Sequence, residues 1–281
     1  MKKELKQLWK TAFGDTDRYI EYYFSSKADK SHICTDWEGD TLCAMAFFTP
    51  YSVMYRGKEC VAPYLVGVAT DEQFRRQGKM TKVLTEGLLA AKEEGALVAF
   101  LCPENPEVYK KLGFCPAYYR ETFITKKRGT QTLSVTPYMV LDETEQDLVV
   151  KFAADCLESQ KFDLYMKRSR MYYAEVCREL QALDGELLVL REQKRIVAVV
   201  NLIHEDEYEV TECVALPEYT EPILDSLTGA LQTERIWIED THFLKPGDYV
   251  EIEKQEKPYI MILPFNKSWE DAMTCYINDI T

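Results

Sequence analysis

The sequence contains no long apolar run and no pattern typical of a secretion signal. No stretch reaches the roughly 18–20 consecutive apolar residues of a membrane-spanning helix. Residues 1–4 (Met-Lys-Lys-Glu) pass directly into a polar helical pattern, which is unlike a signal peptide. Hydrophobic residues still make up 46% of the 281, enough for a core. We therefore expect a soluble cytoplasmic protein without a membrane partner, and two domains of about 100–200 residues each.

Clustered metal ligands and cysteine pairs are also missing from the sequence. The nine cysteines are irregularly spaced, and no Cys-x-x-Cys pair occurs. Several of them, such as Cys43, Cys102 and Cys213, lie in apolar strand-like runs, and the three histidines are isolated. Structural zinc needs grouped ligands. We predict no metal and no disulfide framework, with the cysteines as small apolar residues in a reducing compartment.

Positive charge is scarce: 34 lysines and arginines face 47 acidic residues, for a net charge of −13. Binding to nucleic acid needs a positive surface, so this balance argues against a nucleic-acid partner. It is compatible with a cationic substrate, either a small molecule or a peptide amine. Solubility alone is the better reason for an acidic surface.

The first half of the chain alternates between helical and two-residue periodicity. Leu5, Leu8, Trp9 and Phe13 repeat at helical spacing up to a break at Gly14. The remaining pattern predicts helices over residues 17–26, 79–92 and 106–112, and strands over 31–37, 41–49, 52–55, 59–70, 96–102 and 118–125. We expect the last of these strands to close the sheet.

The second half repeats this plan at an offset of about 140–150 residues. A polar, basic segment over 126–132 separates the halves and predicts domains at 1–128 and 129–281. In the second, we expect helices over 143–159, 168–183, 219–231 and 268–280, and strands over 186–191, 196–204, 208–216, 235–239 and 258–263. The predicted fold class is α/β with mixed sheets, in two similar domains.

A candidate anion site follows the strand at 59–70. The segment Arg75-Arg76-Gln77-Gly78 leads into the helix predicted from Lys79. A helix N-terminus exposes unpaired N–H groups with a partial positive charge. A glycine lets the backbone approach a phosphate, and neighbouring arginines add charge. The residues fit a pyrophosphate, although turns of this kind also occur without any ligand.

A second motif follows the next strand, and together the two resemble a known family. The chain lacks the Gly-x-Gly-x-x-Gly and Walker lysine patterns of common nucleotide folds. Instead, Arg75-x-x-Gly78 is followed by Tyr109-x-x-x-Gly113-Phe114. In order and spacing these resemble the signature of GNAT N-acetyltransferases, over roughly residues 41–125. The family usually has glycine or alanine where this chain has Met80.

That departure is shared by one branch of the family, the tandem-GNAT proteins similar to the Eis (enhanced intracellular survival) acetyltransferases. The branch carries a second, degenerate GNAT domain, which fits the internal repeat. Its members usually end in a sterol-carrier-like domain. Here we expect that domain to be absent or reduced to the tail after Pro264.

The resemblance implies acetyl-CoA as cosubstrate and assigns residues to it. Val68, Ala69 and Thr70 end the strand whose backbone pairs with the pantetheine arm, where an N–H binds the thioester oxygen. Glu104 and Asn105 flank the pantetheine. The pyrophosphate is held by the turn and the start of the helix, namely Arg75, Arg76, Gln77, Gly78, Lys79, Met80 and Thr81.

The resemblance also implies that Tyr109 is the general acid, which would protonate the departing thiolate. An ordinary tyrosine pKa of about 10 keeps it protonated at neutral pH. The alternative is a plain aromatic anchor on an amphipathic helix. The general base stays open, because the C-terminal carboxylate used in the Eis-like branch is not carried over to Thr281. A water relay to an acidic residue is an equal option.

The second half lacks the site. Residues 217–222 contain no Arg-x-x-Gly and are acidic, which would repel a pyrophosphate. We therefore expect one CoA site per chain. An aromatic group in the first half is predicted to pack in the core or to line an acceptor pocket, namely Tyr19, Tyr22, Tyr23, Phe24, Phe47 and Phe48.

These observations predict an N-acetyltransferase in which a primary amine attacks acetyl-CoA directly in a ternary complex. The alternative is a non-catalytic acyl-CoA sensor or interaction protein, which would not need the acid Tyr109. A tRNA-dependent aminoacyl transferase is disfavoured by the charge of −13 and the intact CoA turn. The acceptor and the oligomeric state, a homo-oligomer included, stay open.

Overall fold

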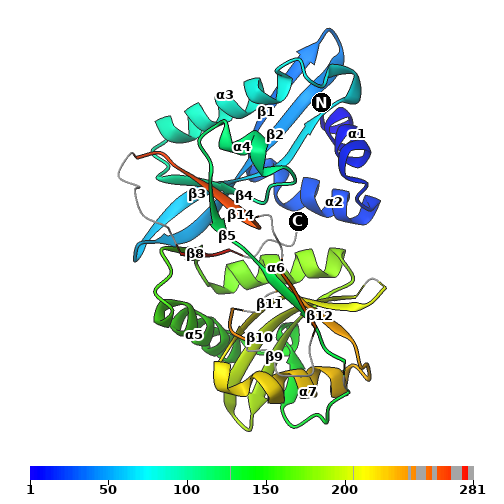
Figure 1. Cartoon of the computed structure of the whole chain (residues 1–281), viewed down its shortest axis with the longest axis vertical. Coiled ribbons are helices and arrows are strands. Elements are labelled where there is room, and N and C mark those ends of the chain that lie inside the picture. Colours follow the sequence, from blue (N-terminus) through cyan, green and yellow to red (C-terminus); the bar gives the residue numbers. More distant parts are fainter. Residues whose placement is uncertain are drawn as a thin grey trace. The chain divides into compact units, whose positions relative to one another are not determined.

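The computed structural model describes residues 1–126, 128–204, 206–239, 242–244, 251–254, 258–266 and 274–277. The chain forms two compact units (Figure 1). The first contains Met1–Tyr118 and Pro258–Asp279, and the second contains Tyr119–Lys257. The N-terminal segment of the first unit therefore ends at residue 118, ten residues before the predicted boundary at residue 128. The first unit also includes a segment near the end of the chain. Within the described ranges, no helix is long and apolar enough to cross a membrane.

Two helices open the first unit and bury an aromatic cluster. Helix α1 (Lys2–Phe13) ends at Gly14, and α2 (Asp17–Ser26) begins with Thr16 accepting a hydrogen bond from the Tyr19 amide. Trp9 of α1 packs on Tyr23 of α2 and on Phe47 of the sheet, with ring centroids 4.5 and 5.6 Å apart. The aromatics Tyr19, Tyr23, Phe24 and Phe47 are all buried. For these four residues the structure supports core packing rather than an acceptor pocket.

The sheet of the first unit contains strands from both ends of its sequence. Its strands are β1 (His32–Glu38), β2 (Thr41–Tyr55), β3 (Lys58–Thr70), β4 (Val98–Leu101), β5 (Cys115–Tyr118) and β14 (Ile260–Pro264). The order is β1-β2-β3-β4-β14-β5, with β3 and β4 parallel. Helix α3 (Lys79–Glu93) covers the opposite face from α1: Phe47 points to Trp9, whereas the next residue, Phe48, meets Gly87 of α3. Alternation along β2 therefore gives both faces a core.

The strand predicted to close this sheet does not do so. Residues 118–125 divide between β5 and β6 (Glu121–Ile124), and β6 pairs with β12 and β13 in the second unit. The place beside β5 in the first unit is taken by β14, which is antiparallel to both β4 and β5. In Figure 1 the orange-red β14 lies among the green strands of the first unit. The prediction that 118–125 closes the first sheet was wrong, because a strand pattern does not specify its partner.

The second unit repeats the plan of the first. Its sheet has the order β13-β6-β12-β11-β10-β9-β7. Strands β9, β10, β11, β12, β6 and β13 occupy the places of β1, β2, β3, β4, β14 and β5. The fold class, with two similar mixed sheets, is confirmed. The elements of this unit are β7 (Ser134–Pro137), α5 (Glu143–Ser159), β8 (Leu164–Met166), α6 (Arg170–Ala182), β9 (Glu186–Glu192), β10 (Arg195–His204), β11 (Tyr208–Ala215), α7 (Thr220–Ala230), β12 (Ile236–Ile238) and β13 (Glu251–Lys254).

Two smaller expectations also changed. The strands predicted at 41–49 and 52–55 are one strand, β2, which continues through Pro50. The ladder tolerates this proline because its partner on β3 is also a proline, Pro63. Neither proline has an N–H, so neither leaves a donor unpaired across the ladder. Most of the helix predicted at 268–280 lies outside the described residues, but Cys275–Tyr276 form a short strand, β15.

Candidate functional site

The last residues of β3 are reoriented by a β-bulge. Phe47 is aligned with Val66 but Met45 with Ala69, so β3 contains one extra residue over this stretch. Gly67 lies within it at φ +59°, and a Cβ there would come within 2.4 Å of the Trp9 ring. Only glycine fits this close approach in a left-handed conformation. The bulge therefore sets the direction in which residues 68–70 leave the sheet.

Strands β3 and β4 pair over a short stretch only and then separate. Their parallel ladder has one aligned pair, Tyr64 with Phe100. Beyond that pair β3 continues to Thr70, whereas β4 ends at Leu101. The edge of β3 that faces β4 is thus left for a ligand to pair with through backbone groups.

The turn before α3 lines a cavity and leads into a helix whose first amides have no side-chain cap. Arg76 has φ +63° and Gly78 φ +79°, both left-handed. Gly78 is the N-cap of α3, and no side chain caps the helix there. A Cβ on Gly78 would meet nothing within 4 Å, so this side of the turn is open. The positive end of α3 is therefore uncovered, as an anion site requires.

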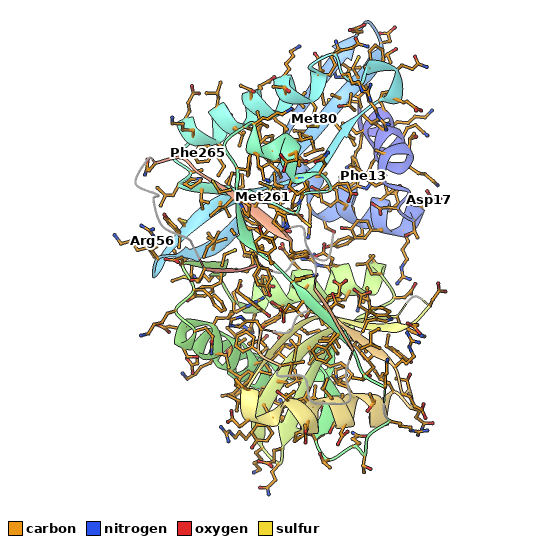
Figure 2. The ribbon with its side chains drawn as sticks, in the orientation of Figure 1. Phe13, Asp17, Arg56, Met80, Met261 and Phe265 are labelled. Atoms are coloured by element: carbon orange, nitrogen blue, oxygen red, sulfur yellow. The ribbon has the colours of Figure 1, made fainter. Side chains whose placement is uncertain are left out.

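A cavity of about 750 Å³ joins this turn to the end of β3. Its lining contains every predicted cofactor residue except Gln77 and Asn105. The residues that line it are Ala12, Phe13, Val68, Ala69, Thr70, Phe74, Arg75, Arg76, Gly78, Lys79, Met80, Thr81 and Glu104. Figure 2 shows Phe13 at the end of α1 and Met80 at the start of α3.

Three of these lining residues were missed from the sequence. Ala12, Phe13 and Phe74 belong to no part of the signature motifs. In the sequence, Phe13 ends an apolar stripe directly before Gly14, and in the structure its side chain is 45% exposed. A large exposed aromatic beside a glycine break is a candidate contact for a flat ligand group such as a nucleobase.

The cationic side chains around the turn point in different directions. Arg75 Nε lies 3.5 Å from the Thr70 carbonyl oxygen and so stays beside the end of β3. The Lys79 ammonium donates to Glu38 at 2.5 Å and lies 5.9 Å from the centre of the Phe74 ring. The Gln77 side chain donates to the Gln73 carbonyl at 3.0 Å.

Tyr109 lies on the helix that follows β4. Helix α4 (Pro106–Lys110) starts at Asn105, whose side-chain oxygen accepts a hydrogen bond from the Glu107 amide at 3.1 Å. The Tyr109 carbonyl accepts from the amides of Leu112 and Phe114, and Gly113 between them has φ +93°. The Phe114 ring then packs edge-on against Tyr109, with centroids 5.9 Å apart. The Tyr-x-x-x-Gly-Phe motif is thus a helix end that fixes the Tyr109 ring.

Burial defines the acid–base state of Tyr109. Its ring packs against the same core cluster as the partly buried Val68 and Met80, two residues of the cavity. Burial first, and then the nearby Cys102, raises the pKa of the Tyr109 hydroxyl to about 12. The hydroxyl is therefore protonated at neutral pH. Tyr109 itself is not among the residues that line the cavity.

The matching position of the second unit is filled by protein side chains. Strand β11 also carries a bulge, at Thr211, and its ladder with β12 ends at Val210 and Ile238. The buried Arg120 reaches across, donating to Glu239 at 2.6 Å and to the Thr211 carbonyl at 3.5 Å. The turn before α7 contains Pro217–Tyr219 and has no glycine.

Comparison with known proteins gives this arrangement a class. Residues 2–117 match the family model described as acetyltransferase (GNAT) domain. The chain therefore carries a GNAT acetyltransferase domain over these residues, and the bulge, the amide turn and the Tyr-x-x-x-Gly-Phe helix all lie within it. A comparison with curated proteins found no match.

Solved structures extend the likeness over nearly the whole chain. A probable N-acyltransferase from Enterococcus faecalis has a TM-score of 0.73 at 12% identity, covering 94% of this chain and 70% of that one. A GCN5-related N-acetyltransferase from Anabaena variabilis gives 0.68 at 12%, with the same coverages. Eis1 from Mycobacterium abscessus gives 0.60 at 12%, covering 92% and 70%. Since each of these matches covers more than nine tenths of the chain, both units share the fold of these structures.

Proposed function

We propose that this protein transfers the acetyl group of acetyl-CoA to a primary amine. One observation carries the proposal. The uncapped turn of residues 76–79 borders the same cavity as the end of β3, where β3 has separated from β4. The negative pyrophosphate suits the uncovered amides of this turn, with Arg75 and Arg76 beside it. The pantetheine arm suits the free edge of β3 at residues 68–70. Glu104 and Asn105 flank it from the end of β4.

The proposed reaction joins an amine nitrogen to the thioester carbon. The carbon–nitrogen bond forms, the carbon–sulfur bond breaks, and the sulfur takes a proton. Starting from an ammonium, the nitrogen loses two protons, of which one ends on the thiol and one in solvent. A backbone N–H at the end of β3 stabilises the oxyanion in the tetrahedral intermediate.

Tyr109 assists the departure of the thiolate. With a pKa of about 12 its hydroxyl is a weaker acid than a thiol, whose pKa is about 8.5. Its contribution in the transition state is therefore a hydrogen bond to the developing negative sulfur. Tyr109 keeps its own proton, and the proton that the sulfur takes comes from the reacting ammonium through solvent. No carboxylate is assigned as the base.

One CoA site per chain follows from the second unit. Arg120 bridges the ends of β11 and β12 where the first unit leaves β3 and β4 apart. Acidic residues, Glu218 and Glu221, precede and begin α7 in place of the arginines of the first unit. We infer that the second unit is a degenerate, structural GNAT domain.

The alternative is a protein that binds acyl-CoA without catalysis. Release of thiol from acetyl-CoA with a panel of polyamines, aminoglycosides, amino acids and lysine peptides separates the two. We expect at least one amine to support turnover, and Tyr109→Phe to lower kcat about 100-fold with unchanged affinity for CoA. If CoA binds normally and no amine releases thiol, the sensor function is the better description.

A further inference from the structure

Two lysines of the first turn of α3 converge on one buried carboxylate. Asp36 of β1 is 4% exposed. Lys79 Nζ lies 3.2 Å from its Oδ2, and Lys82 Nζ donates to its Oδ1. Glu38 of the same strand accepts from Lys79 at 2.5 Å. Residues three apart share a face of a helix, so this face of α3 is tied to β1.

This arrangement reverses the usual electrostatics of a helix start. Cations in the first turn are unfavourable because the helix N-terminus is itself positive, and acidic residues are preferred there. The first turn of α3 contains no acidic residue. The compensating carboxylates come from β1 instead, and they bind the lysine side chains rather than the backbone amides.

The consequence concerns the anion cavity. An acidic cap within the turn would occupy the amides of residues 76–81 and repel a phosphate. The carboxylate of Asp36 lies on β1 and not in the turn, so it neutralises the two lysines without binding the amides. Hydrogen bonds, first from Lys82 and then from Lys79, hold the pKa of Asp36 below its usual value, so it stays ionised at neutral pH.

We propose that Asp36 is the positioning residue of the phosphate-binding turn. It anchors the first turn of α3 to β1 and binds the ammonium groups of Lys79 and Lys82. The anion is then recognised by backbone amides together with Arg75 and Arg76. This inference rests on the proposed function, because it concerns the affinity of the same site for CoA.

The test is a double-mutant cycle on the dissociation constant for CoA, measured by calorimetry with the full chain. We expect Asp36→Asn and Lys82→Met each to weaken CoA binding about tenfold, and the double variant to be no weaker than Asp36→Asn alone. Asp36→Glu restores most of the affinity. For the single variants, KM for acetyl-CoA rises in step, whereas kcat at saturation changes less than about twofold.

A matched control removes an ion pair of the same unit outside the site. Lys2 pairs with Asp29 at 3.3 Å, and both side chains are exposed. Lys2→Met should therefore leave CoA affinity within about twofold of the wild type. If Asp36→Asn fails to fold, Lys82→Met still decides, because the Lys82 side chain is 64% exposed.

Each other outcome has a defined meaning. Tighter binding in Asp36→Asn would show that the released lysines are phosphate ligands and would overturn the inference. So would unchanged binding in both single variants, or losses that add fully in the double variant. If the wild type gives no heat with CoA at all, the proposed function fails first, independently of Asp36.

Discussion

The most revealing perturbation lies far along the chain from the site, in strand β14. Met261 is fully buried between β4 and β5, aligned with Leu101 and with Pro116 (Figure 2). It belongs to the core cluster that includes Phe114, against which Tyr109 packs. The family model matches residues 2–117, which do not include β14. Strand β14 nevertheless completes the sheet of this domain by pairing with β4 and β5. Met261→Ala should therefore damage the first unit and its site.

The magnitude follows from the burial of Met261. Replacing a fully buried methionine by alanine costs about 2–5 kcal/mol, because transfer energy is lost and a cavity remains. A loss of ~3 kcal/mol lowers the folding equilibrium constant by about two orders of magnitude. The exposed Met171 of α6, at 74% exposure, supplies the control. Met171→Ala should change the stability by less than about 0.5 kcal/mol.

The assay combines urea unfolding, followed by circular dichroism, with calorimetric titration of CoA. Met261→Ala should unfold at a lower urea concentration than the wild type, and it should bind CoA more weakly at urea concentrations near its unfolding midpoint. Met171→Ala should match the wild type in unfolding midpoint and in affinity for CoA. A chain that ends at residue 257 should lose CoA binding. The reasoning is refuted if that shortened chain binds CoA normally, or if Met261→Ala is as stable as Met171→Ala.

Two further predictions concern the site itself. Arg76→Ala should weaken binding of CoA about tenfold but leave binding of acetyl-pantetheine, which lacks the phosphates, unchanged; equal losses for both ligands in calorimetry would remove Arg76 from the phosphate site. Burial raises the pKa of Tyr109 to about 12, so its acid form is complete below about pH 10 and is lost only as the pH rises through 12. Titration of Tyr109 should therefore not lower kcat between pH 7 and 9.5. In this range the pH profiles of the wild type and Tyr109→Phe should have the same shape.

The local structure of the site was predictable because it depends on short-range patterns. Gly78 marked the start of α3, and Gly113 marked the end of the turn after α4, where a positive φ is needed. The two-residue alternation predicted β1 and β3, although it divided β2 into two strands, and the continuous apolar run predicted β4. Backbone conformation and periodicity at these positions are properties of neighbouring residues.

The long-range pairing was not predictable in the same way. Strand β6 lies in the first half of the sequence and β14 in the second, and each completes the sheet formed mainly by the other half. Which sheet a strand joins depends on contacts between distant residues, such as Met261 with Leu101. The Asp36–Lys79–Lys82 cluster was missed for the same reason, since its members come from β1 and α3. Phe13 and Phe74 joined the site only through the fold.

The central claim is that the amides at the start of α3 hold the pyrophosphate of CoA. A crystal structure of the complex with acetyl-CoA tests it most directly. The account predicts one cosubstrate per chain, with its pyrophosphate within hydrogen-bond distance of the amides of residues 76–81 and its pantetheine arm along residues 68–70. Density for the cosubstrate between β11 and β12 of the second unit, or a pyrophosphate bound away from this turn, would contradict it.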